Sequence, residues 1–297
     1  MVRKGNESVV EGHPTINELL IFDKSKKIKS LVVTIKHIRT RDYDLVVNLQ
    51  RFLSSGIIAT FSKGKVIVGF DKNPMAFCYH RKMHHVIESR GTNHEIDRNH
   101  TLIAQYTDLK PAKPKLYPSE AQVEKVAALK SKPYLTVAPA SVWFTKQWPE
   151  TKWIEFLDGL VGYQIYLLGA PSDVELCGRI KENTKNELVV SLAGELKPLE
   201  SVALMMDAVM NYVNDSAPLH FASSVNAPTT AIFNSTVPEF GFGPLSDKSA
   251  VVQTSEELNC RPCGLHGFKE CPEVHFKCAI DINSKILIDV LPTLKID

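Results

Sequence analysis

The sequence predicts an α/β protein of two Rossmann-like domains, of which the first is incomplete. From residue 134 onward, short apolar runs rich in β-branched residues alternate with helix-like segments, the pattern of a parallel sheet covered on both faces. The first part of the chain shows the same alternation with too few units. Between Leu109 and Ser119 the chain carries three prolines and three lysines, a composition typical of a linker. The predicted domains are therefore residues 1–113 and 114–297.

The first domain contains short, β-branched runs bounded by polar residues, which is the signature of strands. The expected strands are residues 18–22, 43–49 and 65–70. Residues 24–41 are expected to form a helix or a mixture of strand and helix, and residues 52–61 a helix. Residues 71–100 are polar and His-rich and fit no clear pattern.

The second domain has the more regular alternation. The expected strands are residues 134–137, 164–168, 188–190, 209–213 and 230–233, and the expected helices are 119–130, 150–161, 173–184, 198–207 and 217–225. Because parallel strands end at the same edge of a sheet, the loops that follow the first, second and fourth of these strands should open side by side.

The strand at 209–213 leads through Asn214 into a polar turn and a helix. Asp215 or Ser216 is a natural N-cap, and Pro218 suits a first helical turn, where its missing N–H costs no hydrogen bond. The unpaired N–H groups of such a turn form an anion site with partial positive charge. We hypothesise that this turn holds a nucleotide-sugar donor.

The loop after the strand at 134–137 carries the hydroxyls of Ser141 and Thr145 and the amine of Lys146. A lysine in this place can meet a phosphate as a point charge. The alternative is that Lys146 is solvated and that Trp148 and Trp153 belong to the core.

Two further features of this edge have equally plain structural explanations. In the turn after residue 168, Gly169 permits close backbone approach, and Asp173 can cap the next helix as readily as it can meet a ligand. His220 lies about one turn into the last helix, and a lone histidine there is more often structural than catalytic. Only the convergence of several loops makes these residues candidates for a site.

Taken together, these segments resemble the ADP-heptose:lipopolysaccharide heptosyltransferase family of GT-B glycosyltransferases. The resemblance rests on Ala138-Pro139, Lys146-Gln147-Trp148-Pro149, Leu168-Gly169-Ala170, Ser191-Leu192-Ala193-Gly194, and Asn214-Asp215-Ser216 with His220. It implies the GT-B fold, with two Rossmann-like domains facing a cleft. It also implies transfer of heptose from ADP-heptose to a lipopolysaccharide-core acceptor, inverting and metal-independent, with no required cofactor.

The resemblance also implies roles for particular residues. Ser141 and Lys146 would contact the donor diphosphate, with Lys146 stabilising the leaving group. The sugar and phosphates would be held by Asp215, Ser216, Ala217 and His220. The usual threonine-glycine of the family is here Ser216-Ala217, which keeps the hydroxyl and loses some backbone freedom.

The general base for the acceptor hydroxyl is not assigned. Family members begin with a strand and a Gly-containing loop that carries an Asp, and nothing before Val2 supplies it. Asp42 or Asp44 are substitutes without a positional argument. The alternative to an enzyme is therefore a non-catalytic nucleotide-sugar-binding protein or a truncated, inactive remnant of the same fold.

Charge is divided unevenly along the chain. Residues 1–113 hold 19 Lys and Arg against 11 Asp and Glu, whereas the remaining residues hold 16 against 22. A basic first domain fits an anionic glycolipid acceptor and peripheral contact with a membrane, although solvated basic faces would give the same count. The sequence shows no nucleic-acid-binding module, no signal peptide and no apolar run of about 20 residues. We expect a cytoplasmic protein, peripheral to the inner membrane.

Four of the six cysteines fall close together near the end of the chain. Cys260 and Cys263 form a CxxC pair that is followed by Cys271 and Cys278, a spacing typical of a structural zinc site. The alternative is that these residues are structural thiols or form disulfides.

Overall fold

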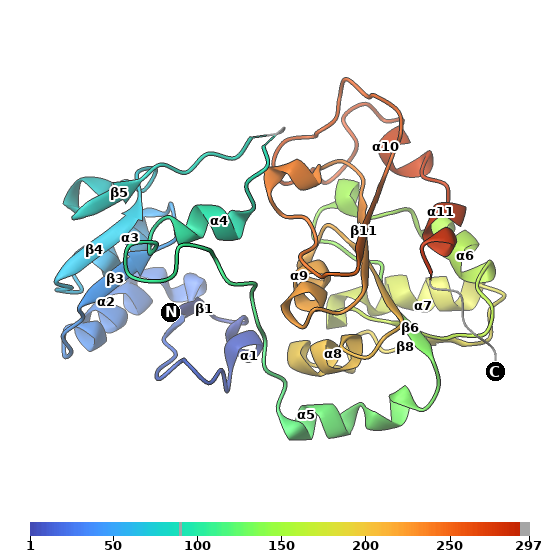
Figure 1. Cartoon of the computed structure of the whole chain (residues 1–297), viewed down its shortest axis with the longest axis horizontal. Coiled ribbons are helices and arrows are strands. Elements are labelled where there is room, and N and C mark those ends of the chain that lie inside the picture. Colours follow the sequence, from blue (N-terminus) through green and yellow to red (C-terminus); the bar gives the residue numbers. More distant parts are fainter. Residues whose placement is uncertain (89–90, 292–297) are drawn as a thin grey trace. The chain divides into compact units, whose positions relative to one another are not determined.

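The computed structural model describes residues 1–88 and 91–291 and divides into two compact units, Met1–Ala112 and Lys113–Asp297 (Figure 1). The division falls one residue from the boundary expected from the Pro- and Lys-rich segment. Both units contain parallel strands connected through helices, so the predicted α/β class is confirmed.

The second unit is built on a six-stranded parallel sheet with the order β11-β10-β9-β6-β7-β8. Its strands are β6 (Tyr134–Ala138), β7 (Gln164–Leu167), β8 (Val189–Ser191), β9 (Met210–Asn214), β10 (Thr229–Phe233) and β11 (Ser249–Gln253). Every residue of β6, β9 and β10 is buried. Central strands covered on both faces are continuous apolar runs, which is why these were visible in the sequence.

Helices cover both faces of this sheet. They are α5 (Glu120–Lys125), α6 (Glu150–Asp158), α7 (Val174–Asn183), α8 (Pro198–Met205), α9 (Ala217–Ser224), α10 (Lys277–Ile280) and α11 (Lys285–Asp289). One core cluster joins β-strand residues to α6, α7 and α11, and a second joins them to α8 and α9. Trp148 and Trp153 lie in the first cluster with 1% exposure each, so the core assignment of both tryptophans is confirmed.

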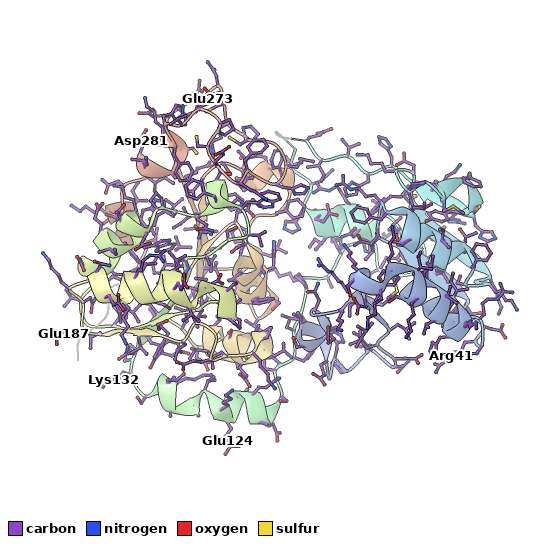
Figure 2. All side chains as sticks on the ribbon, turned by 180° about the vertical axis from the view of Figure 1, so that it is seen from behind. Arg41, Glu124, Lys132, Glu187, Glu273 and Asp281 are labelled. Carbon is purple, nitrogen blue, oxygen red and sulfur yellow. The ribbon has the colours of Figure 1, made fainter. Side chains whose placement is uncertain are left out.

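The segment after β11 returns across the second unit toward α10 and α11. In Figure 2, Lys132 and Glu187, which precede β6 and β8, lie in the lower left part of this unit, whereas Glu273 and Asp281 lie at its upper end. The segment therefore lies near the end at which the strands finish. Within the described residues, no helix is long and apolar enough to cross a membrane.

The first unit contains two separate parallel sheets. A pair, β1 (Val2–Arg3) and β2 (Ile21–Phe22), stands apart from β3 (Leu45–Asn48), β4 (Val66–Phe70) and β5 (Arg81–Met83). The helices are α1 (Glu7–Val10), α2 (Lys27–Ile38), α3 (Leu53–Thr60) and α4 (Glu95–His100). Strand β5 and helix α4 lie in the stretch that had no pattern, because β5 is short and mostly exposed.

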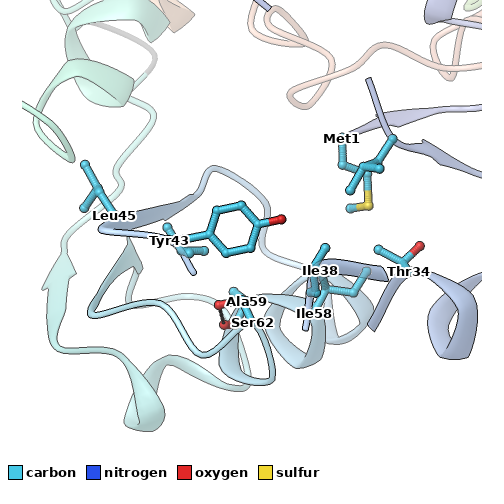
Figure 3. Close-up of a pocket in the computed structure, with 10 residues that line it drawn as sticks. Met1, Thr34, Ile38, Tyr43, Leu45, Ile58, Ala59 and Ser62 are labelled. Carbon is cyan, nitrogen blue, oxygen red and sulfur yellow. Dashed lines mark hydrogen bonds between the residues drawn. The ribbon is translucent and has the colours of Figure 1, made fainter. Parts of the chain in front are cut away.

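An apolar cavity of about 220 Å³ lies in this unit between α2, α3 and β3 (Figure 3). It is lined by Met1, Leu20, Thr34, Ile38, Tyr43, Leu45, Val46, Ile58, Ala59 and Ser62. The hydroxyl of Ser62 donates to the carbonyl of Ala59 at 2.6 Å. The side chains that line this cavity carry no charge that could hold a diphosphate.

Candidate active site

The loop after β6 is fastened to the end of β9 by one buried side chain, that of Asn214. Its Nδ2 donates to the carbonyl of Pro139 at 2.7 Å, and its Oδ1 accepts from the backbone N–H of Trp148 at 3.1 Å. Asn214 therefore holds both ends of the loop that carries Ser141 and Lys146. The convergence expected at this edge of the sheet occurs because β6 and β9 are neighbours.

Lys146 and Asp215 form an ion pair at this edge, with 2.6 Å between Nζ and Oδ2. The two side chains are only 15% and 8% exposed. The hydroxyl of Thr236 donates to the same Oδ2 at 2.6 Å. Loops after β6, β9 and β10 thus each contribute one group to a single cluster.

The cluster leaves one carboxylate oxygen available. Among the described residues, both side-chain contacts of Asp215 use Oδ2, which leaves Oδ1 to accept a hydrogen bond from a ligand. Lys146 carries three N–H donors and has one of them committed to Asp215. The arrangement can therefore offer an acceptor and cationic donors to the same ligand.

Ser216 occupies the N-cap position of α9, and Ala217 is the first helical residue. Within the part of the chain that the structure describes, the Ser216 side chain makes no capping hydrogen bond. Its Oγ lies 3.4 Å from the carbonyl of Asn214 and 3.5 Å from that of Ala140. The hydroxyl is thus beside the loop that carries Lys146, and it does not occupy the N–H groups of the first turn.

The other sequence-predicted residues lie nearby without joining the ion pair. The carbonyl of Ser141 accepts from Gln147 Nε2 at 2.6 Å, which closes the loop upon itself. The His220 ring meets the edge of Phe242, with ring centroids 6.5 Å apart. In the turn after β7, Asp173 Oδ2 accepts from the Ala170 N–H at 2.8 Å. This capping hydrogen bond accounts for an aspartate at position 173 without a ligand.

The sequence reasoning missed Thr236 and Arg261. Thr236 comes three residues after β10 and shares the edge of the sheet with the predicted loops, which was the available signal. Arg261 lies inside the CxxC pair, where the sequence gives no signal for a contact with the loop after β10.

The four clustered cysteines are free thiols. Cys260 Sγ lies 4.0 Å from His275 Nε2, and Cys263 Sγ donates to the Cys260 carbonyl at 3.1 Å. Burial, with the neighbouring thiols adding to it, raises the pKa of Cys278 to about 12. Among the described residues, no group of three or more His, Cys, Asp or Glu side chains is placed to hold a metal ion. The structural zinc stays a prediction.

Neither substitute for the general base has a suitable environment. Asp44 is paired with Lys65 at 2.6 Å, and the hydrogen bond from this lysine lowers the pKa of Asp44. A base that works near neutral pH needs a raised pKa. Asp42 is exposed to solvent. The base remains unassigned.

The family described as glycosyltransferase family 9 (heptosyltransferase) matches residues 32–270. The chain belongs to this family. It is therefore a glycosyltransferase that acts in lipopolysaccharide core biosynthesis, and the resemblance read from the sequence is confirmed.

Individual heptosyltransferases are similar over most of this family member. Lipopolysaccharide heptosyltransferase 1 of Pseudomonas aeruginosa is 25% identical over 290 residues, which cover 89% of this chain and 76% of the relative. Lipopolysaccharide heptosyltransferase 3 of Escherichia coli is 26% identical over 247 residues, covering 77% and 71%.

Solved structures share the GT-B fold. The E. coli ADP-heptose lipopolysaccharide heptosyltransferase II superposes with a TM-score of 0.73 at 20% identity, covering 96% of this chain and 85% of that one. A family 9 glycosyltransferase from Veillonella parvula gives a TM-score of 0.77 at 19% identity, covering 96% and 84%. At these identities the likeness concerns the fold alone.

Proposed function

We propose that this glycosyltransferase moves heptose from ADP-heptose to a lipopolysaccharide-core acceptor, with inversion at the transferred carbon and without a catalytic metal. The observation that carries the proposal is the Lys146–Asp215 pair at the carboxyl ends of β6 and β9, directly before α9. Ligands of parallel α/β sheets bind at this edge. The E. coli enzyme of similar fold is described as an ADP-heptose heptosyltransferase, which supports the choice of donor.

The donor diphosphate would lie between Lys146 and the first turn of α9. A helix N-terminus offers backbone N–H groups and a partial positive charge to an anion. Ser216 and the backbone of Ala217 begin this turn, with His220 one turn further on. Ser141 would contact the diphosphate from the loop after β6. The free Oδ1 of Asp215 would accept a hydrogen bond from a sugar hydroxyl, because a carboxylate placed against phosphate would repel it.

The proposed reaction requires stabilisation of the departing ADP and a base that removes the proton of the acceptor hydroxyl. Negative charge grows on the diphosphate as the glycosidic bond breaks, and preorganised cationic donors stabilise that charge most in the transition state. Lys146 and the α9 amides supply such donors, which supports a metal-independent mechanism. Displacement by the acceptor hydroxyl from the opposite face of the sugar inverts its configuration and requires removal of one proton by the base.

The acceptor side of the proposal rests on α2 and its flanks in the first unit. Residues 24–41 contain seven Lys and Arg and no Asp or Glu. Ile28, Val32 and Val33 on this helix are 79%, 47% and 56% exposed. Figure 2 shows Arg41, which ends this stretch, at the lower edge of its unit. An exposed basic and apolar helix face suits an anionic glycolipid at the cytoplasmic surface of a membrane.

The cysteine cluster has no role in the proposed chemistry. Four cysteines around one zinc would leave no open coordination position, so a zinc there would be structural. Elemental analysis of the purified protein decides between about one equivalent of structural zinc and a set of structural thiols.

The proposal is tested by donor binding and transfer with the purified chain. Calorimetry with ADP-heptose should show binding. Incubation with a heptose-free core glycolipid should then give a product one heptose heavier, with the inverted anomeric configuration by NMR and an unchanged rate in EDTA. Binding without transfer would establish the non-catalytic alternative. Absence of binding to both ADP-heptose and ADP would refute the donor site itself.

A further inference from the structure

We propose that Thr236, together with Arg261, is a positioning element of the transferase that fixes Asp215 and through it Lys146. The inference rests on the donor site proposed above and adds two residues to it. Neither residue needs to touch the donor. Their effect on transfer would come through the carboxylate that they orient.

Thr236 is placed to lock the Asp215 carboxylate. The threonine is 1% exposed, and its hydroxyl reaches the same Oδ2 atom that holds Lys146 Nζ, both at 2.6 Å. A hydroxyl that donates to an ionised carboxylate forms one of the stronger protein hydrogen bonds. With Oδ2 held from two sides, rotation of the carboxylate is restricted and Oδ1 keeps a fixed direction.

Arg261 in turn fixes the backbone that carries Thr236. Its guanidinium donates to the carbonyl of Asn234 at 2.6 Å, to that of Thr236 at 2.8 Å and to that of Phe233 at 3.2 Å. The neighbouring Cys263 N–H donates to the Ser235 carbonyl at 2.7 Å. The rigid fork of an arginine can satisfy several carbonyls in this way, whereas a lysine acts as a single point charge.

The same C-terminal segment also supports Lys146. The Phe268 N–H donates to Thr145 Oγ1 at 2.8 Å, and the Thr145 N–H donates to the Phe268 carbonyl at 3.1 Å. Gly267 has φ +75°, and a Cβ on it would lie 2.8 Å from Thr145 Oγ1 and 3.2 Å from Lys146 Cγ. The stretch after β11 therefore packs against Thr145 and the side chain of Lys146 and, through Arg261, holds the backbone of Thr236, which is hydrogen-bonded to Asp215.

Thr230, in the strand that precedes Thr236, provides a matched control. It is fully buried in β10, and its hydroxyl has no hydrogen-bond partner among the described residues. Thr230→Val removes a hydroxyl of the same kind six positions earlier, without removing a hydrogen bond. Any general effect of a Thr→Val change in this strand and its loop would appear in both variants.

The experiment compares T236V, T236S and T230V for donor affinity, kcat and KM with ADP-heptose. We expect T236V to lose at least about tenfold in kcat/KM, because a hydrogen bond to a charged group is lost. T236S should restore most of this loss, and T230V should stay within about twofold of the wild type. R261K should show a loss in the same direction as T236V.

A double-mutant cycle separates positioning from mere stability. If Thr236 acts through Asp215, T236V should add little to the loss already caused by D215N. Full additivity, or equal activity of T236V and T230V in a wild type that binds and transfers, would overturn the inference and leave the proposed function standing. A wild type that binds neither ADP-heptose nor ADP would overturn both.

Discussion

Lys146 is a nearly buried cation whose charge is balanced by the carboxylate of Asp215. Its contribution to donor binding and transfer can be measured by replacing it. In the free enzyme Asp215 neutralises it, so the lysine is held in place before any donor arrives. A hydrogen-bonding cation that is already in place needs no rearrangement when negative charge develops on the leaving group.

Replacing Lys146 with alanine should therefore reduce donor binding or turnover by more than tenfold. Removal of one such donor typically costs about 3–4 kcal/mol of transition-state stabilisation. The measurement is kcat/KM for ADP-heptose together with the calorimetric Kd. Lys130→Ala is the matched control, since Lys130 is 16% exposed, pairs with Asp207 and precedes β6 at the opposite end of the strand. Equal kinetics in the two variants would contradict the site assignment.

At the residue scale, the sequence brings out residues that follow a recognisable strand, and their role in donor binding stays a prediction. Lys146 and Asp215 were both expected at the site, and the structure pairs them. Thr236 was missed although it follows a predicted strand, and Arg261 was missed because its hydrogen-bond partners lie far away in sequence. Arg261, in the stretch after β11, donates hydrogen bonds to backbone carbonyls that follow β10. No local sequence pattern predicts a contact of this kind.

At the scale of elements, burial decided which strands could be read from the sequence. The five expected strands of the second unit agree with the structure to within one residue at each end. Strand β11 was missed because it is a largely exposed edge strand, with only Val252 buried. The helix at 217–224 was anticipated from its N-cap and Pro218, although Ser216 holds the N-cap position without capping through its side chain in the described part of the chain.

Helix α7 carries a buried thiol, that of Cys177, which makes the stability of the folded second unit depend on pH. Cys177 is 0% exposed, and burial raises the pKa of its thiol from 9.0 to about 12. The unfolded chain loses this proton near pH 9, whereas the folded chain keeps it. Since the folded state then binds more protons, its stability must fall as the pH rises through this window.

Urea unfolding at a series of pH values above 9 should show this loss. For one group the slope of the free energy of unfolding approaches about 1.4 kcal/mol per pH unit. Cys177→Ala should be less stable at neutral pH, because it leaves a small cavity, and should show a shallower alkaline slope. Parallel slopes in the variant and the wild type would show that the thiol does not titrate as described.

At the scale of the whole molecule, charge is segregated between the two units. The basic excess lies in residues 1–113, and within it residues 24–41 carry cations and exposed apolar side chains on the same stretch. The residues proposed to bind the donor all belong to the second unit. A division of this kind suits a transferase that meets a soluble donor with one unit and an anionic lipid with the other.

The membrane contact can be tested with vesicles of phosphatidylcholine, with and without phosphatidylglycerol. We expect the wild type to sediment with the anionic vesicles at low salt and less at high salt, because surface charges are screened. Each Lys near such a surface contributes about 1 kcal/mol, so K29E/K36E should weaken binding more than tenfold. I28S/V33S should weaken it without changing the salt dependence, since it removes apolar contact alone.

The control for this experiment reverses the same number of charges on the other unit. Lys181 and Lys185 are exposed on and after α7, so K181E/K185E changes net charge identically and leaves α2 intact. If binding to anionic vesicles depended only on the net charge of the protein, both double variants would lose binding to the same extent. That result would contradict the assignment of α2 as the membrane-facing element. If K29E/K36E alone releases the protein, the basic stretch is the membrane-facing element. Transfer to detergent-dispersed acceptor should then be affected less than transfer to acceptor embedded in vesicles.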